Sequence, residues 1–202
     1  MPRREREQAI LDAAGQVFAS GYHGAAMDEI ARLADVSKPM LYAYFGSKEG
    51  LYMAYVDRTG RELLDRLVGA GGGERSPTEL LRSRILEFLA FVAEHRNGWR
   101  VLFGELNSSR PVAEQVAQLR SQIAEWITAM LEPSGDAEYA LPPAAVDAIA
   151  HAIVGAGESL ANWWLENPEV GREQVAEWYV GVVLGAAAAA TRGADAAGRI
   201  RP

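Results

Sequence analysis

The sequence contains no cysteine and only three histidines, His23, His95 and His151, which lie far apart along the chain. Without thiols there can be no disulfide and no cysteine-ligated metal, and scattered histidines do not form the closely spaced ligand set of a zinc site. The chain also has no G-x-S-x-G motif and no P-loop motif of the kind that marks common catalytic sites. We therefore expect no metal, no cofactor and no enzymatic activity.

Long apolar runs are missing as well. No uninterrupted run approaches the roughly 20 apolar residues that span a bilayer, and the first ten residues, MPRREREQAI, contain no apolar signal segment. These absences predict a cytoplasmic protein without a membrane partner. The net charge of −7 argues against a protein that coats nucleic acid over its whole surface, because its mean field repels phosphate.

Lysine is almost absent, since only Lys38 and Lys48 occur among the 20 basic residues. Both lie in the stretch SKPMLYAYFGSKEGLY, together with three tyrosines and a phenylalanine, and no acidic residue occurs between Val36 and Lys48. Salt screens distant charges beyond about 10 Å, so the local sign of charge can decide a contact. This window is therefore the candidate for a basic surface on an acidic chain.

The spacing of apolar residues predicts an all-α protein of about nine helices. Gly21 is expected to end the first helix, and Gly46 the third, in the manner of a C-terminal glycine. A flexible connection is expected at residues 69–77 and a Pro/Gly-rich loop at 132–142. The predicted helices are 3–20, 27–34, 38–45, a long helix from Lys48 that carries Leu67, 78–95, 98–107, 111–131, 143–166 and 171–191.

Residues 25–48 have the pattern of a helix-turn-helix, in which the second helix enters the DNA major groove. Ala31 is small where the two helices cross, and Val36 and Leu41 are apolar and can seal the small core. The hydroxyl of Ser37 is expected to cap the recognition helix, because its oxygen can accept a hydrogen bond from a free backbone N–H. Pro39 is tolerated in the first turn, where no intrahelical donor is needed.

The outer side of this unit supplies the candidate DNA contacts. Tyrosine hydroxyls and lysine ammonium groups suit phosphate oxygens, and the free N–H groups at the helix start beside Lys48 add to the same attraction. Pro39 and Met40 lack strong donors, so we expect them to read thymine methyl groups and groove shape. The predicted DNA-binding residues are Ser37, Lys38, Pro39, Met40, Tyr42, Tyr44 and Lys48.

The run GYHGAAMDEIARLADVSKPMLYAYFGSKEGLY resembles the DNA-binding signature of the TetR family of bacterial transcriptional regulators, closely over about residues 5–55. The resemblance implies that residues 38–44 form the recognition helix and that Tyr42, Tyr44 and Lys48 contact DNA phosphates. The chain has Ala25 where the family usually has a helix-starting threonine, which removes a cap generally worth about 1 kcal/mol. It has Asp35 where the turn usually has glycine, and aspartate tolerates a left-handed backbone better than most residues.

The resemblance also implies the domain plan, with a helix-turn-helix DNA-binding domain at residues 1–50 (motif about 27–46) and a helical ligand-binding and dimerisation bundle at 51–202. All five tryptophans lie after residue 98. An aromatic-lined cavity is a usual small-molecule site, although each ring can equally be ordinary core. The candidate pocket residues are Phe88, Trp99, Phe103, Trp126, Glu158, Asn162 and Trp163.

Helix 143–166 carries a second stripe of His151, Glu158 and Asn162 beside its apolar stripe. These groups either orient a ligand or lie at a dimer interface, and the interface is favoured. The last helix contains Gly181 and Gly185, which let another helix approach closely. Helices 143–166 and 171–191 are therefore expected to form half of a four-helix homodimer interface.

The sequence thus predicts a homodimeric repressor that binds a roughly palindromic double-stranded DNA operator and is released by a small hydrophobic or aromatic effector. An activator with the same DNA-binding unit is not distinguished from a repressor by sequence. The alternative from another class is a helical small-molecule-binding protein or enzyme that does not bind DNA. The operator sequence, the regulated genes and the identity of the effector are not encoded in any motif.

Overall fold

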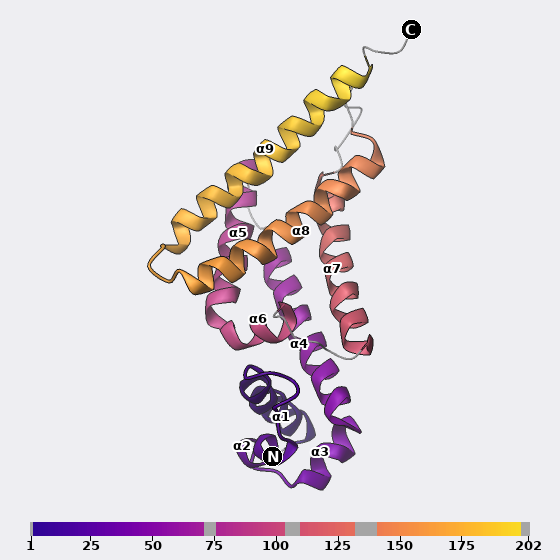
Figure 1. Cartoon of the computed structure of the whole chain (residues 1–202), viewed down its shortest axis with the longest axis vertical. Helices are drawn as coiled ribbons and strands as arrows, with labels where there is room; N and C mark the ends of the chain where they lie inside the picture. Colours follow the sequence, from indigo (N-terminus) through magenta and orange to yellow (C-terminus); the bar gives the residue numbers. More distant parts are fainter. Residues whose placement is uncertain (1, 71–75, 104–109, 132–140, 199–202) are drawn as a thin grey trace. The chain divides into compact units, whose positions relative to one another are not determined.

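The structure, a computed structural model, describes residues 2–70, 76–103, 110–131 and 141–198, with the backbone alone for 190–198. Within these ranges it contains nine helices and no strand, which confirms the predicted all-α class. In chain order the helices are α1 (Arg3–Phe18), α2 (Met27–Leu33), α3 (Lys38–Phe45), α4 (Lys48–Gly69), α5 (Pro77–Glu94), α6 (Arg96–Phe103), α7 (Arg110–Leu131), α8 (Pro143–Glu166) and α9 (Arg172–Gly198) (Figure 1).

Most helix ends lie within two residues of the predicted ones. The clearest difference is α9, which continues to Gly198 instead of ending near residue 191. The residues after the alanine run include further alanines, and alanine has the highest helix propensity. The end of the predicted helix 98–107 and nearly all of the predicted loop 132–142 lie outside the described residues, as do residues 71–75 of the predicted flexible connection.

The chain divides into two compact units. The first contains Met1–Asp65 and Val92–Gln118, and the second contains Arg66–Phe91 and Leu119–Pro202. Helix α4 therefore contributes to both units. This division follows contacts and not function, so the functional boundary between residues 50 and 51 stays a prediction.

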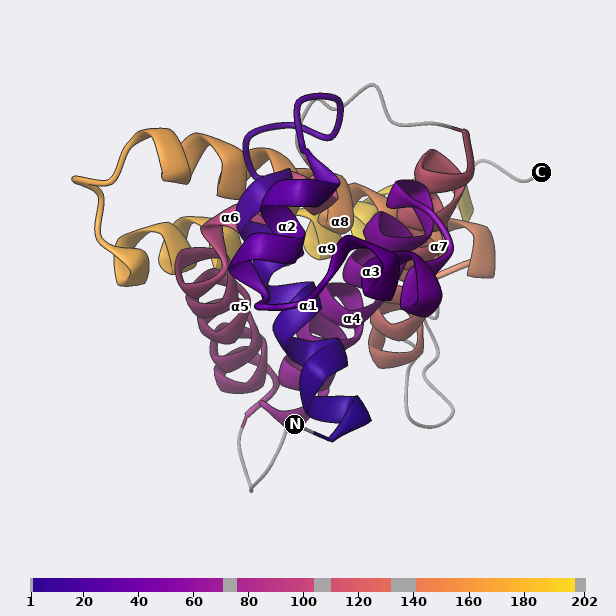
Figure 2. The same ribbon diagram turned by 90° about the horizontal axis from the view of Figure 1, so that it is seen from below.

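In the first unit, Tyr55 of α4 fills the space beside two glycines. A Cβ atom on Gly15 of α1 would lie 2.5 Å from the Tyr55 ring, and one on Gly98 of α6 would lie 2.9 Å from its hydroxyl oxygen. The buried Tyr52 hydroxyl donates to the Val101 carbonyl at 2.6 Å. These contacts fix α4 between α1 and α6, and the first three helices lie together with the start of α4 (Figure 2).

In the second unit, α8 and α9 pack as an antiparallel pair. The indole N–H of Trp164 donates to the Val170 carbonyl at 2.8 Å, which closes the connection between the two helices. Deeper in the pair, the Tyr179 hydroxyl donates to the Ile153 carbonyl, and a Cβ atom on Gly157 would lie 2.7 Å from that hydroxyl. Burial raises the pKa of Tyr179, so the phenol stays neutral and keeps its proton for this hydrogen bond.

This packing predicts opposite outcomes for two glycines of α8. Gly157→Ala adds a methyl group against a hydrogen-bonded, buried Tyr179, and overpacking costs about 1–3 kcal/mol. Improved helix propensity returns at most about 1 kcal/mol. Urea unfolding should therefore give a free energy of unfolding lower by about 1–2 kcal/mol for Gly157→Ala, whereas Gly155→Ala, with open space around its Cβ position, should be neutral or more stable. Equal stability of the two variants would contradict this packing.

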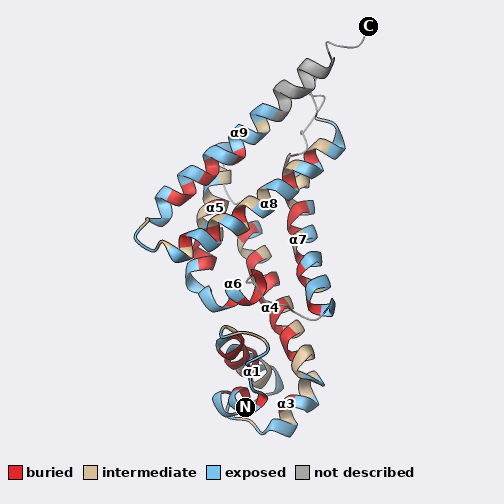
Figure 3. Cartoon of the chain, viewed as in Figure 1, coloured by how far each residue is buried: buried red, intermediate tan, exposed pale blue. Residues whose placement is uncertain are grey.

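Helices α8 and α9 expose large apolar side chains in the single chain. Many positions along both helices are coloured as exposed in Figure 3. Trp163 and Trp178 are 39% and 48% exposed, with ring centroids 6.3 Å apart, and Val182 and Leu184 are also exposed. By length and composition alone α8 is apolar enough to cross a membrane, and only 22% of its most apolar window is buried. An exposed apolar surface on paired helices usually marks an interaction site.

Candidate nucleic-acid interface

Helices α2 and α3 pack on each other through a tight turn. Asp35 adopts a left-handed backbone with φ 52°, which confirms that aspartate can replace glycine at this point of the turn. The Val36 N–H donates to the Ala31 carbonyl at 3.0 Å and closes the turn. Ala31 and Leu41 are buried as predicted, so the sequence pattern has produced a helix-turn-helix.

The predicted side-chain cap of α3 is wrong, because the Ser37 hydroxyl makes no capping hydrogen bond. A capping side chain normally accepts from the second or third residue of the helix. Here the second residue is Pro39, which has no N–H, and the N–H of Met40 donates instead to the Ser37 carbonyl at 2.9 Å. The residue before α2 also provides no side-chain cap; it is Ala26, while Ala25 is buried.

The turn between α3 and α4 follows the predicted chemistry. Gly46 has φ 71° and ends α3, as expected for a C-terminal glycine. The Ser47 hydroxyl oxygen accepts a hydrogen bond from the Gly50 N–H at 2.9 Å and so caps α4. The other N–H groups in the first turn of α4 thus lie close to Lys48, where a phosphate oxygen can be bound.

The predicted DNA-binding residues all lie on α3, at the residue before it or at the first residue of α4. Ser37, Lys38, Pro39 and Tyr42 are exposed, and Met40, Tyr44 and Lys48 are half-buried. Helix α3 has eight residues, a length of about 12 Å at about 1.5 Å per residue, which matches the width of the major groove. Their direct contact with DNA stays a prediction.

Lys38 forms an ion pair that the sequence pattern did not predict. Its ammonium nitrogen lies 2.9 Å from an Asp28 carboxylate oxygen on α2. The hydrogen bond and the charge of Asp28 raise the pKa of Lys38. Exposed ion pairs contribute little to stability, so this pair can open when a phosphate or a base edge approaches.

Lys48 is also held by groups that sequence reasoning missed. Its ammonium nitrogen donates to the His23 carbonyl at 3.3 Å and lies 4.7 Å from the centroid of the Tyr22 ring. Burial, followed by the nearby charge of Glu49, raises the pKa of Tyr22. The loop between α1 and α2 therefore contacts the first residue of α4.

Two arginines at the start of α1 meet Tyr44, one of the predicted phosphate contacts. The guanidinium carbon of Arg3 lies 5.5 Å from the Tyr44 ring centroid, and Arg6 donates to the Tyr44 hydroxyl oxygen at 3.5 Å. The only signal for them in the sequence is the basic segment PRRER, whose proximity to α3 depends on the tertiary fold. They extend positive charge beyond α3.

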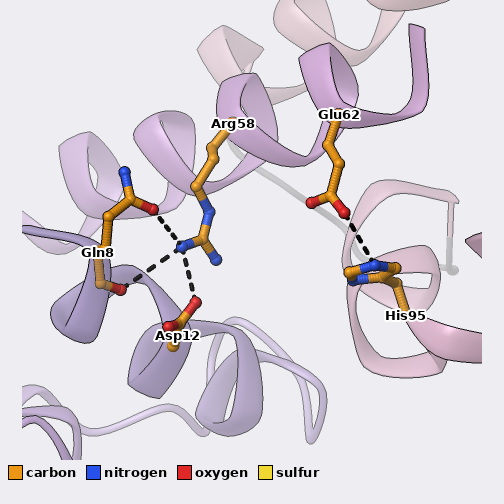
Figure 4. Close-up of polar contacts among 5 residues, drawn as sticks. All are labelled: Gln8, Asp12, Arg58, Glu62 and His95. Atoms are coloured by element: carbon orange, nitrogen blue, oxygen red, sulfur yellow. Dashed lines mark hydrogen bonds and ion pairs between the residues drawn. The ribbon is translucent and has the colours of Figure 1, made fainter. Parts of the chain in front are cut away.

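Arg58 ties α4 to α1 (Figure 4). One guanidinium nitrogen donates to the Gln8 side-chain oxygen at 3.0 Å and to an Asp12 carboxylate oxygen at 2.7 Å. One turn further along α4, a Glu62 carboxylate oxygen lies 3.0 Å from the His95 ring nitrogen (Figure 4). Helix α4 is therefore anchored within the first unit from Tyr52 to Glu62.

The candidate pocket residues are distributed over both units. Trp99 and Phe103 are buried in the first unit and pack on each other, with ring centroids 4.4 Å apart. The others belong to the second unit, where Phe88 lies beside Tyr179 with centroids 6.5 Å apart. Asn162 and Trp163 are exposed on α8. A ligand site lined by these residues stays a prediction.

The remaining two candidates of the second unit each contact an arginine. Glu158 accepts two hydrogen bonds from Arg120 of α7, at 2.8 and 2.9 Å, so it is paired within the chain, whereas the structure leaves His151 exposed. The guanidinium carbon of Arg84 lies over the Trp126 ring, 5.0 Å from the ring centroid.

Arg84 differs from Arg120 in its partners. It donates to the sulfur of Met130, a weak acceptor, and its Nε is buried without a hydrogen-bond partner. Burial lowers the pKa of Arg84. In the part of the chain that the structure describes, no group of three or more Asp, Glu and His side chains is placed to hold a metal ion.

Comparisons with known proteins match both the helix-turn-helix region and the helices that follow it. Residues 10–55 match the family profile described as "Bacterial regulatory proteins, tetR family", and residues 77–185 match "Tetracyclin repressor-like, C-terminal domain". The HTH-type transcriptional activator FasR of Mycolicibacterium smegmatis is 32% identical over 169 residues, which cover 83% of this chain and 75% of the relative.

Solved structures show the same fold. A TetR-like transcriptional regulator from Rhodococcus sp. RHA1 has 35% sequence identity and a TM-score of 0.76, over 93% of this chain and 98% of that chain. The transcriptional regulator FadR from Bacillus subtilis, solved in complex with stearoyl-CoA, has 19% identity and a TM-score of 0.72, over 87% of this chain and 96% of that chain.

Proposed function

Because the chain belongs to the TetR family of DNA-binding transcriptional regulators, we propose that it binds a palindromic operator as a homodimer and represses transcription until a small apolar or aromatic effector releases it. The observation that carries the DNA-binding part is the outer surface of α3. It presents Tyr42, Tyr44 and Lys38, the helix itself contains no acidic residue, and it continues into the capped start of α4, where Lys48 lies. The regulator acts in the cytoplasm and catalyses no reaction.

The proposed homodimer forms through α8 and α9. In the single chain these helices expose Trp163, Trp178 and Val182, and Gly181 of α9 has open space around its Cβ position. A second copy of the same pair would bury these apolar groups in a two-fold, four-helix interface. Such a dimer presents two copies of α3 to successive major grooves about 34 Å apart, which is why the operator is expected to be palindromic.

The proposed effector binds in the regulatory bundle, where Phe88 and Trp126 provide apolar surface. Arg84 lies against Trp126 with an unpartnered buried nitrogen, so it can receive a polar or anionic end of such a molecule. FadR from Bacillus subtilis, which has the same fold, holds stearoyl-CoA, and this supports an apolar ligand for the bundle without identifying it. The effector acts only if it binds one arrangement of the dimer more tightly than the other.

Activation of transcription is a second candidate function, because the relative FasR is named a transcriptional activator. A reporter gene under the promoter of this protein's own gene distinguishes the two. Repression predicts that the protein lowers reporter transcription and that the effector restores it. Transcription that rises when the protein is added would show an activator, and transcription that does not respond would contradict regulation at this promoter.

A further inference from the structure

We propose that Tyr22, together with the His23 carbonyl, positions the Lys48 ammonium group for a DNA phosphate before DNA arrives. This proposal rests on the proposed function, since it assumes that Lys48 contacts the DNA backbone. It assigns a role in DNA binding to the loop between α1 and α2, which does not belong to the helix-turn-helix. In this arrangement Tyr22 is a positioning residue and does not itself contact DNA.

The geometry constrains the end of a long, flexible side chain. The Lys48 nitrogen donates to the His23 carbonyl at 3.3 Å and lies over the Tyr22 ring at 4.7 Å from its centroid, within the range of a cation–π interaction. An ammonium group has three N–H donors. With one directed at the carbonyl and the ring attracting the charge, donor capacity remains for a phosphate oxygen on the exposed side.

Tyr22 is itself fixed by the core of the first unit. Its ring stacks on Phe18 of α1, with centroids 6.0 Å apart, and meets the edge of Tyr52 of α4 at 5.1 Å. Phe18 and Tyr52 are both fully buried, and the Tyr52 hydroxyl is bonded to the Val101 carbonyl. The Tyr22 ring under Lys48 is therefore held in place, whereas the lysine side chain has four rotatable bonds.

Fixing Lys48 in advance removes part of the conformational cost of binding. A lysine that is free in solution loses side-chain freedom when it binds a phosphate, and immobilising such a side chain opposes association. A lysine that is already held on Tyr22 has lost that freedom during folding. Because a dimer contains two copies of the contact, Tyr22→Leu should weaken operator binding by about five- to a hundredfold.

A double-mutant cycle on the full chain tests the proposal, with operator affinity measured for the parent, Tyr22→Leu, Lys48→Ala and the double variant. If Tyr22 acts through Lys48, Tyr22→Leu weakens binding in the parent background and has no further effect once Lys48 is alanine. Tyr22→Phe keeps the ring and should bind within about twofold of the parent. If Tyr22→Leu does not fold, Tyr22→Met removes the ring at similar apolar volume and takes its place.

The outcomes separate this inference from the function on which it rests. If the ring-deleting variant weakens binding equally in both backgrounds, Tyr22 only supports the fold and the positioning role is wrong. If Lys48→Ala binds operator like the parent, Lys48 makes no phosphate contact and the inference fails with that contact. If the parent binds no genomic fragment, the proposed function itself fails.

Discussion

Replacing Lys48 by alanine, together with Tyr42→Phe, should weaken operator binding by about 10⁴-fold or more at every DNA sequence tested. Lys48 begins α4 beside free N–H groups, and the Tyr42 side chain is 43% exposed on α3. Hydrogen bonds to charged groups contribute about 1.5–3 kcal/mol each, and a dimer loses each contact twice. The loss is independent of base sequence because phosphates carry no sequence information directly.

The salt dependence of binding distinguishes a phosphate contact from a general loss of structure. Each neutralised phosphate contributes a slope of about −0.9 to the logarithm of the affinity against the logarithm of salt concentration. Lys48→Ala in a dimer should therefore make the slope less steep by about 1.8. Arg172→Ala removes one positive charge at the exposed start of α9 and is the matched control, which should leave both affinity and slope unchanged. Parent-like binding by the Lys48 and Tyr42 variants would mean that these residues do not contact phosphates.

Gly50→Ala should cause a large loss of stability although it places a better helix former in α4. A Cβ atom at this position would lie 2.1 Å from the Phe45 carbonyl oxygen, which belongs to the backbone of α3 and cannot rotate away. Overpacking costs about 1–3 kcal/mol and occasionally more, whereas helix propensity returns about 1 kcal/mol. We expect a net decrease of about 2 kcal/mol in the free energy of unfolding, with weaker operator binding because α3 must shift.

The matched control for this variant is Gly24→Ala, in the same unit, where no atom lies within 4 Å of the added methyl group. Urea unfolding followed by circular dichroism gives both stabilities, and operator affinity is measured where both variants are folded. Gly50→Ala that is as stable as Gly24→Ala would show that α3 and α4 are not joined by the tight turn described above.

Signals that act within a few residues predicted the helix-turn-helix well. Asp35 takes the left-handed turn, Gly46 ends α3 and Ser47 caps α4, each as the local sequence indicated. The failed cap at Ser37 is also a local matter. Pro39 occupies the second position of α3 and has no N–H to donate to the Ser37 hydroxyl. The sequence shows this proline, but the capping rule alone does not take it into account.

Contacts between distant segments were beyond sequence reasoning. The pairing of Lys38 with Asp28 and the hydrogen bond of Arg58 to Asp12 depend on how helices pack, and periodicity reports a helix face but not its partner. The same limit applies to the candidate pocket. Aromatic content placed Trp99 and Phe88 in one group, whereas the structure assigns them to different compact units. Exposed and buried aromatics have the same sequence signature, so composition alone does not separate a pocket from a core.

Selection of genomic DNA fragments by the purified protein, followed by sequencing, tests the central claim most directly. A dimer with two reading helices predicts that the enriched fragments share an inverted repeat whose half-sites are centred about 34 Å apart, roughly one helical turn. The variant carrying Lys48→Ala and Tyr42→Phe should enrich these fragments much less at the same salt concentration. If the parent protein enriches no fragment above the input DNA, or if both proteins enrich the same fragments equally, the outer surface of α3 is not the DNA-binding surface.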